Sequence, residues 1–166
     1  VVVAVPGIDR VFLHNPGANN TFTNADIPEE SLDEADFFHF GYPPIMRSMF
    51  INDGEELLAI FKRVKAKGIA TSLDLAAIDP YSESGKADWR LILQKVLPYV
   101  DFFVPSFEEL CFALDRENYD RLEAAGGDMT ESLDMEKDVK PLADELIAMG
   151  CKAVLIKCGI SGMYYK

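Results

Sequence analysis

Short apolar runs alternate with longer amphipathic segments along most of this chain, from Ala35 onward. Short runs of this kind are typical of buried strands, whereas apolar residues spaced three or four positions apart are typical of helices that cover a sheet. Strands that alternate with helices form βαβ units around a parallel sheet. The sequence therefore predicts an α/β fold, and 49% hydrophobic residues are enough for a buried core.

The predicted strands are residues 36–40, 70–75, 101–104 and 153–158. The predicted crossover helices are residues 55–67, 89–100 and 139–149. Gly68 and Gly150 follow the first and last of these helices, at the position where glycine commonly ends a helix. The segment 115–138 is dense in Asp and Glu, and we expect it to be a solvated, partly helical excursion.

The first residues have a different pattern, that of a β-hairpin. Residues 1–5 are apolar, a turn begins at Pro6, and residues 10–14 alternate polar and apolar side chains. We therefore divide the chain into a hairpin with its connecting loop, residues 1–22, and an α/β core, residues 23–166. The chain starts without Met, and both of its ends fall in predicted strands, so we expect a piece of a longer protein.

The charge balance is acidic, with 16 Lys and Arg against 28 Asp and Glu and a net charge of −12. Such a surface repels phosphate backbones and anionic headgroups, so no nucleic-acid or membrane partner is expected. The apolar runs are also far shorter than the roughly 20 residues of a membrane span. The three cysteines form no Cys-x-x-Cys pair and lie away from both histidines, which argues against zinc. We expect buried thiols in the reducing cytoplasm.

Ligands of open parallel sheets bind beside the carboxyl ends of the strands, so the residues that follow each strand are the candidates for a site. Ser106 and Glu109 have the spacing of a capping box at the start of a helix. This pair has two interpretations, which the spacing does not separate. It is either a purely structural cap, or a carboxylate that holds a hydrated cation near a phosphate at the helix N-terminus.

Three other strand ends carry weaker signals. Lys157 leaves a strand just before Gly159 and Gly162, and glycines allow the backbone to approach an anion closely, although a plain turn has the same glycines. Asp74 could contact a hydroxyl or a cation, or accept hydrogen bonds from loop N–H groups. Tyr42 precedes two prolines and suits either a pocket wall or the core.

Taken together and in order, these pieces resemble the ribokinase-like (PfkB) family of carbohydrate kinases over nearly the whole chain. The matching blocks are RVFL at 10–13, PGAN at 16–19, FHFG at 38–41, SLD at 72–74 with Trp89 downstream, FVPSFEE at 103–109 and VLIKCGISG at 154–162. The resemblance implies a parallel sheet flanked by helices, with the N-terminal hairpin as part of a small β lid over the sugar. It also implies transfer of the γ-phosphoryl of ATP to a sugar hydroxyl, with Mg²⁺ screening the phosphates.

The resemblance also assigns roles to individual residues. Glu109 matches the glutamate of the family's Asn-x-x-Glu motif, which acts on magnesium and phosphate through water. The expected nucleotide-binding residues are Ser106, Lys157, Gly159 and Gly162. The expected sugar-binding residues are Asn19, Gly41, Tyr42 and Asp74. Lid hairpins of this family sometimes pair between subunits, so a homodimer through residues 1–14 is a further expectation.

Several departures from the family pattern affect these roles. Ser106 replaces the usual Asn, and Ala76 and Ile78 replace the Asn and Arg of the family's Asp-x-Asn-x-Arg pattern. The N-terminal Gly-Gly and Asn that grip the sugar are missing, as is the C-terminal Gly-Ala-Gly-Asp that supplies the anion hole and catalytic base. The segment 126–128, Gly-Gly-Asp, looks like that last motif but lies before the VLIKCGISG block, so we interpret it as a helix terminator.

We therefore expect the central part of a sugar kinase, with no catalytic residue of its own and no turnover by itself. Two other functions stay open. The strand-end loops and the cap would equally serve a non-catalytic α/β module that binds a small molecule or a protein. A nucleoside could also replace the sugar as the acceptor.

Overall fold

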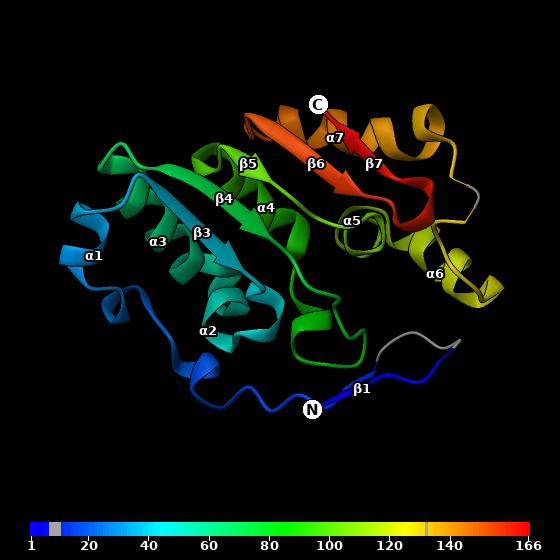
Figure 1. Ribbon diagram of the computed structural model, residues 1–166, viewed down its shortest axis with the longest axis horizontal. Helices are drawn as coiled ribbons and strands as arrows, with labels where there is room; N and C mark the ends of the chain where they lie inside the picture. Colours follow the sequence, from blue (N-terminus) through cyan, green and yellow to red (C-terminus); the bar gives the residue numbers. More distant parts are fainter. Residues whose placement is uncertain (7–10, 132) are drawn as a thin grey trace.

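A five-stranded sheet forms the centre of the computed structural model, which describes residues 1–6, 11–131 and 133–166 (Figure 1). The strands are β3 (Phe37–Gly41), β4 (Ala70–Asp74), β5 (Phe102–Phe103), β6 (Ala153–Lys157) and β7 (Met163–Tyr165). They lie side by side in sequence order; β3 to β6 are parallel, and β7 is antiparallel to β6. The predicted α/β fold is confirmed, but a purely parallel sheet was wrong at this edge. Only the turn η8 (Gly159–Ser161) joins β6 to β7, and a parallel crossover needs about a dozen residues.

The strands differ from their predicted bounds by one or two residues at their ends. The largest difference is at β5, which keeps only two of the four residues predicted. On one side, Asp101 is buried and its carboxylate accepts a hydrogen bond from the Thr71 N–H at 2.9 Å and pairs with Lys65 and Lys152. On the other side, the Val104 N–H still donates to the Leu73 carbonyl at 2.9 Å, but Pro105, the next residue, has no N–H to donate to the sheet. A strand pattern does not reveal the side-chain contacts of Asp101.

The longer helices are α3 (Glu55–Ala66), α4 (Trp89–Val96), α5 (Phe107–Leu114), α6 (Arg116–Ala125) and α7 (Lys140–Ala148), and two shorter ones are α1 (Glu29–Asp33) and α2 (Arg47–Phe50). The prediction of one helix over 89–100 was wrong, because the chain tightens into the 3₁₀ turn η6 (Leu97–Tyr99) at Pro98, which cannot continue the α-helical hydrogen bonds. The predicted start at 139 was also wrong, since a π-helical turn η7 (Met135–Val139) precedes α7. The acidic excursion is partly helical, as predicted, through α6.

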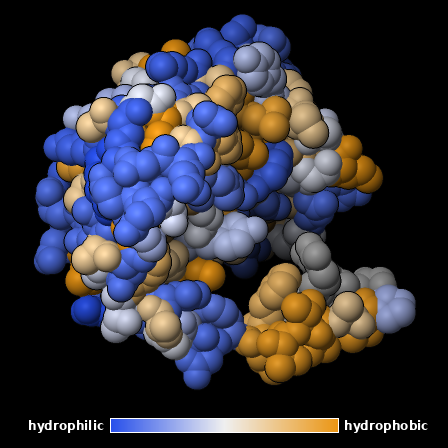
Figure 2. All heavy atoms as spheres, turned by 60° about the vertical axis from the view of Figure 1, so that its left-hand side comes forward, coloured by the Kyte–Doolittle hydropathy of each residue, from blue (hydrophilic) through white to orange (hydrophobic). Residues whose placement is uncertain are grey.

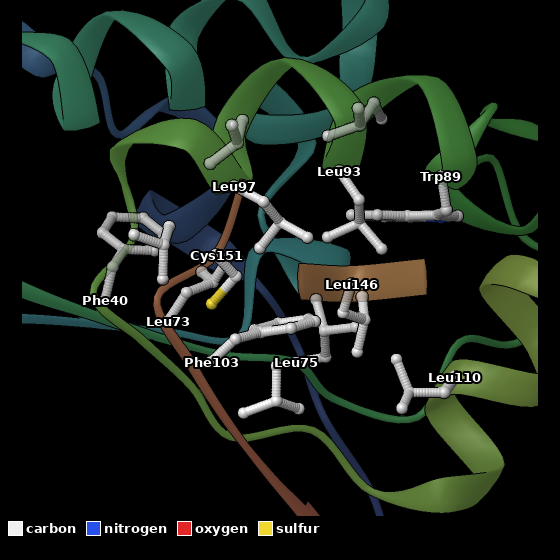
Figure 3. Close-up of a cluster of buried hydrophobic side chains, with 14 of the residues drawn as sticks. Phe40, Leu73, Leu75, Trp89, Leu93, Leu97, Phe103, Leu110, Leu146 and Cys151 are labelled. Carbon is white, nitrogen blue, oxygen red and sulfur yellow. The ribbon is translucent and has the colours of Figure 1, made fainter. Parts of the chain in front are cut away.

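The core lies between the sheet and the helices behind it. Leu73 and Phe103 point from β4 and β5 toward Leu93 of α4 and Leu97 of η6, and all four are fully buried (Figure 3). The three cysteines are buried too, as predicted, and burial raises the pKa of the Cys151 thiol to about 11. None of the helices in the described part of the chain is long and apolar enough to cross a membrane.

The opposite face of the sheet carries no such layer. Phe102 is 45% exposed while its neighbour Phe103 is fully buried, because successive residues of a strand point to opposite faces. Phe37 and Tyr165 are also exposed on the open face, and the Phe37 and Phe102 rings lie 6.2 Å apart. Helices α3 and α4 therefore cover one face of the sheet only (Figure 1).

The N-terminal segment forms a separate two-stranded sheet. Strand β1 (Val2–Val3) pairs antiparallel with β2 (Val11–Phe12), and the Leu13 N–H donates to the Val1 carbonyl at 2.8 Å. The predicted turn covers residues 6–9, of which residues 7–9 lie outside the described residues. Figure 2 shows the apolar residues of this segment as a group that stands away from the body. Its role as a lid, and its pairing with a second subunit, stay predictions.

Candidate functional site

The N-terminus of α5 forms one side of the candidate site. Ser106 is its N-cap and accepts a hydrogen bond from the Glu109 N–H at 3.2 Å, while the Ser106 N–H donates to Glu109 Oε2 at 2.7 Å. The predicted capping box is thus present in both directions. Burial raises the pKa of the Glu109 carboxyl, against the opposing effects of the Ser106 N–H and the Lys157 ammonium, and the Asp74 charge adds to the rise. The half-buried Glu109 carboxylate, with the Lys157 cation nearby, is therefore held at a helix N-terminus, where the helix dipole favours negative charge.

An ion pair crosses the carboxyl edge of the sheet beside this helix. Lys157, the last residue of β6, places its Nζ 2.8 Å from Oδ1 of Asp74, the last residue of β4. The intervening chain continues past β5 beside Lys157, since the Lys157 N–H donates to the Pro105 carbonyl at 2.9 Å, and the ion pair joins the strands on either side of it. The Asp74 side chain is only 16% exposed and that of Lys157 is 42% exposed, so the lysine is the more accessible partner.

A cavity of about 1110 Å³ opens above this edge of the sheet. Its walls come from the loop after β4, from α5 and α6, from the segment that follows α6, and from the end of β6. The lining residues are Ala77, Ile78, Ser106, Glu108, Glu109, Phe112, Tyr119, Glu123, Gly127, Asp128, Met129, Thr130, Lys157 and Gly159. The lining therefore carries four carboxylates and one cation, Lys157, which is already paired with Asp74.

The structure brings together part of the predicted site. Ser106, Glu109, Lys157 and Gly159 line the cavity, and Asp74 is tied to it through Lys157. The four lining residues belong to the predicted nucleotide-binding and metal-binding residues, whereas Asp74 was predicted to bind the sugar.

The other predicted residues lie elsewhere. Gly162 ends η8, where its carbonyl accepts a hydrogen bond from the Cys158 N–H at 2.8 Å, and it is not among the lining residues. Gly41 pairs with Asp74 in the sheet register, and the Tyr42 N–H donates to the Asp74 carbonyl at 3.2 Å, so both adjoin Asp74 without lining the cavity. Asn19 lies in the exposed turn η1 (Gly17–Thr21), on the N-terminal segment.

Tyr42 has an unusual backbone. Its φ is 71°, in the left-handed region that a bulky side chain rarely adopts, and the buried Pro43 and Pro44 follow it. The side chain is 50% exposed, so the core alternative for this residue was wrong. The side chain is exposed but does not line the cavity, so the pocket-wall interpretation stays a prediction.

Sequence reasoning missed the wall made by α6 and the segment after it. The helix-terminator interpretation of the Gly-Gly-Asp segment is confirmed, since α6 ends at Ala125 and Gly126 has a φ of 72°. Nevertheless, Asp128 and Thr130 of the same segment line the cavity. Hydrogen bonds from the Thr130 hydroxyl and N–H lower the pKa of the Asp128 carboxyl, which makes it a weak base. The segment after α6 reaches the cavity by packing against residues that are distant in the sequence, so no local sequence pattern predicted this wall.

The lining is acidic apart from Lys157, which limits the anions that the cavity can hold. Four carboxylates would repel a polyphosphate whose charge no cation neutralises. Within the described residues, no three His, Cys, Asp or Glu side chains are arranged to hold a metal ion directly. Mg²⁺ commonly keeps several of its waters and takes few protein ligands, so Glu109 and Glu108 fit as acceptors for metal-bound water.

A comparison with protein-family models matches residues 1–166 to the pfkB family carbohydrate kinases. The chain belongs to this family. The match covers every block from which the sequence resemblance was drawn. No curated protein matches this pfkB family chain in a direct search.

Solved structures support the same fold for this pfkB family chain. A fructokinase with bound ATP from Xylella fastidiosa matches with a TM-score of 0.63 at 18% identity, over 95% of this chain and 44% of its own. A ribokinase from Thermotoga maritima matches with a TM-score of 0.59 at 19% identity, over 99% of this chain and 43% of its own. A PfkB protein from Polaromonas sp. JS666 matches with a TM-score of 0.58 at 19% identity, over 88% of this chain and 42% of its own. The chain thus spans less than half of the length of these relatives.

Proposed function

We propose that this chain forms the nucleotide-phosphate side of an ATP-dependent carbohydrate kinase. One observation carries the proposal: Lys157, the cap of α5 with Glu109, and the Gly159 turn reach a single cavity from three separate elements. A cation, a helix N-terminus and a glycine turn are the groups that proteins use to bind phosphates. The bound ATP of the Xylella relative and its matching fold add support.

Each residue has a defined task in this proposal. Lys157 binds a phosphate oxygen, and Asp74 holds the lysine at the sheet edge until the nucleotide arrives. Glu109 fixes the start of α5 and orients water around the cation. Mg²⁺, when it arrives with the nucleotide, supplies charge that offsets the acidic lining.

The acceptor is proposed to be a sugar hydroxyl, which would lie near Asp74, Gly41 and Tyr42. The two aspartates at the described site are poor candidates for the general base, and the Gly-Ala-Gly-Asp motif that supplies this base in the family is missing from the sequence. Asp74 is paired with Lys157, and hydrogen bonds lower the pKa of Asp128. We therefore expect the 166-residue chain to bind nucleotide without phosphorylating sugar.

Calorimetric titration with MgATP tests the binding. The native chain should bind, and Lys157→Met should weaken binding by about tenfold or more, the effect of one charge-assisted contact. Lys140→Met is the matched control, because Lys140 is 43% exposed and paired with Glu136, much as Lys157 is 42% exposed and paired with Asp74. Equal loss in both variants, or no binding by the native chain, would contradict the proposal.

A coupled ADP-release assay with a panel of pentoses and hexoses tests the second part. The chain should give no sugar-dependent turnover. Turnover above that of Glu109→Ala would show that the base lies within these residues after all.

A further inference from the structure

The segment after α6 and the turn after β6 are in direct contact, although they lie about 30 positions apart. The Ser161 hydroxyl donates to the Thr130 carbonyl at 2.5 Å. Thr130 is only 2% exposed, and its hydroxyl is fixed by a bond to Asp128 Oδ1 at 2.7 Å. The bond from Ser161 therefore ends on a rigid partner.

A second contact joins the same two segments. Gly159 has a φ of 49°, and a Cβ atom at this position would overlap the Thr130 hydroxyl oxygen. The glycine thus serves two needs, a left-handed backbone and a close approach by a side chain from another part of the chain. Gly162, in the same turn, also has positive φ but has open space where its Cβ would be. Thr130 therefore contacts the turn at both of its ends, through the close approach to Gly159 and the hydrogen bond from Ser161.

We infer that residues 126–130 are a positioning element for the Gly159–Ser161 turn. The Thr130 carbonyl and hydroxyl hold the turn in one shape against the cavity, and Asp128 holds Thr130. A phosphate group meets a preformed turn instead of one that must be ordered on binding, which saves the entropy of that ordering. The inference rests on the proposed nucleotide site, which it deepens by assigning the affinity-setting contact to Ser161 and Thr130.

The position of this segment in the cavity supports the assignment. Gly127, Asp128, Met129 and Thr130 line the same cavity as Lys157 and Gly159, so the element that holds the turn also borders the ligand. Its base is anchored by α6, where the Tyr119 ring packs edge-on against Phe112 of α5, with 5.1 Å between the ring centres. The clamp is therefore tied to the helix whose N-terminus carries Glu109.

Ser161→Ala tests the inference, with Ser161→Thr as the variant that restores the hydroxyl. Two readouts are measured: amide hydrogen exchange of residues 159–162 in the free chain, and MgATP affinity by calorimetry. Ser161→Ala should exchange faster at these amides and bind MgATP about fivefold more weakly, the effect of one lost hydrogen bond. Ser161→Thr should restore both, and the thermal midpoints of the two variants should agree within a few degrees.

The two proposals fail in different ways. If the native chain binds no MgATP, the nucleotide site is wrong, and the exchange data alone then decide whether residues 126–130 hold the turn. Native-like exchange in Ser161→Ala overturns the positioning role. Faster exchange with unchanged MgATP affinity also overturns it, since the clamp would then have no effect on the ligand.

Discussion

The ion pair between Asp74 and Lys157 makes the sharpest prediction about the site. Removing either charge by Asp74→Asn or Lys157→Met should destabilise the fold, and removing both should cost less than the sum of the two. The physical reason is that each single substitution leaves the other charge at the sheet edge without its partner.

The size of this coupling follows from the geometry. At 2.8 Å, Coulomb's law with an effective dielectric constant of about 20 gives a gross attraction of about 6 kcal/mol. Most of this is offset, because Lys157 is 42% exposed and must leave water and lose side-chain freedom to form the pair. Net couplings of exposed pairs are below about 1 kcal/mol, and the greater burial of Asp74 places this pair at the top of that range. We expect a coupling of about 1 kcal/mol.

A double-mutant cycle with urea unfolding measures this coupling. The control cycle uses Lys140 and Glu136, whose side chains are 43% and 71% exposed one helical turn apart, and it should give about 0.3–0.5 kcal/mol. A coupling at Asp74 and Lys157 no larger than that of the control would refute the reasoning. So would a coupling that is unchanged in 1 M salt, where half-exposed charges are strongly screened.

Two further predictions concern the cap of α5. Ser106→Ala should lower the free energy of unfolding by about 1 kcal/mol, because the Glu109 N–H loses its acceptor. Ser106→Asn should keep most of the stability, because Asn also accepts this hydrogen bond. Thermal unfolding of the native chain and the two variants measures both effects. Glu109→Gln should change the pH dependence of stability. Because burial raises the folded-state pKa of Glu109 above its ordinary value of 4.5, the carboxyl's favourable contribution is complete below that pH and is lost as the pH rises through the folded-state pKa. Urea unfolding should therefore show the Gln variant gaining stability relative to the native chain as the pH rises from 4 to 7. A difference in free energy of unfolding that stays constant over this range would contradict the raised pKa of Glu109.

Local patterns in the sequence were enough to predict the layers of the fold. Apolar patterns located each strand of the main sheet, including the C-terminal residues that form β7, and the Ser-x-x-Glu spacing located the start of α5. Both signals involve residues within a few positions of each other, so no knowledge of tertiary packing is needed. The C-terminal residues were expected to form a strand, but the antiparallel direction of β7 was missed because strand direction depends on the short turn that joins it to β6.

The site itself was only partly predictable, because its contacts join distant positions. Asp74 and Lys157 are 83 residues apart, and both strand ends were candidates, yet nothing in the sequence indicates that one neutralises the other. The Thr130 contacts are similar, since they depend on how the segment after α6 packs over the turn at Gly159. Asp128 was assessed for catalysis alone, and its structural task in holding Thr130 has no motif.

The strand order bears on how the molecule is assembled. Each strand of the main sheet pairs with the one before it in the sequence, so a chain emerging from the ribosome can add strands to a single growing edge. No strand has to be inserted between two that have already paired. Strand β5, with two residues, is held on one side only until β6 has been made. Asp74 is therefore in place before its partner Lys157 is synthesised, and the ion pair between them forms only after β6 has been made.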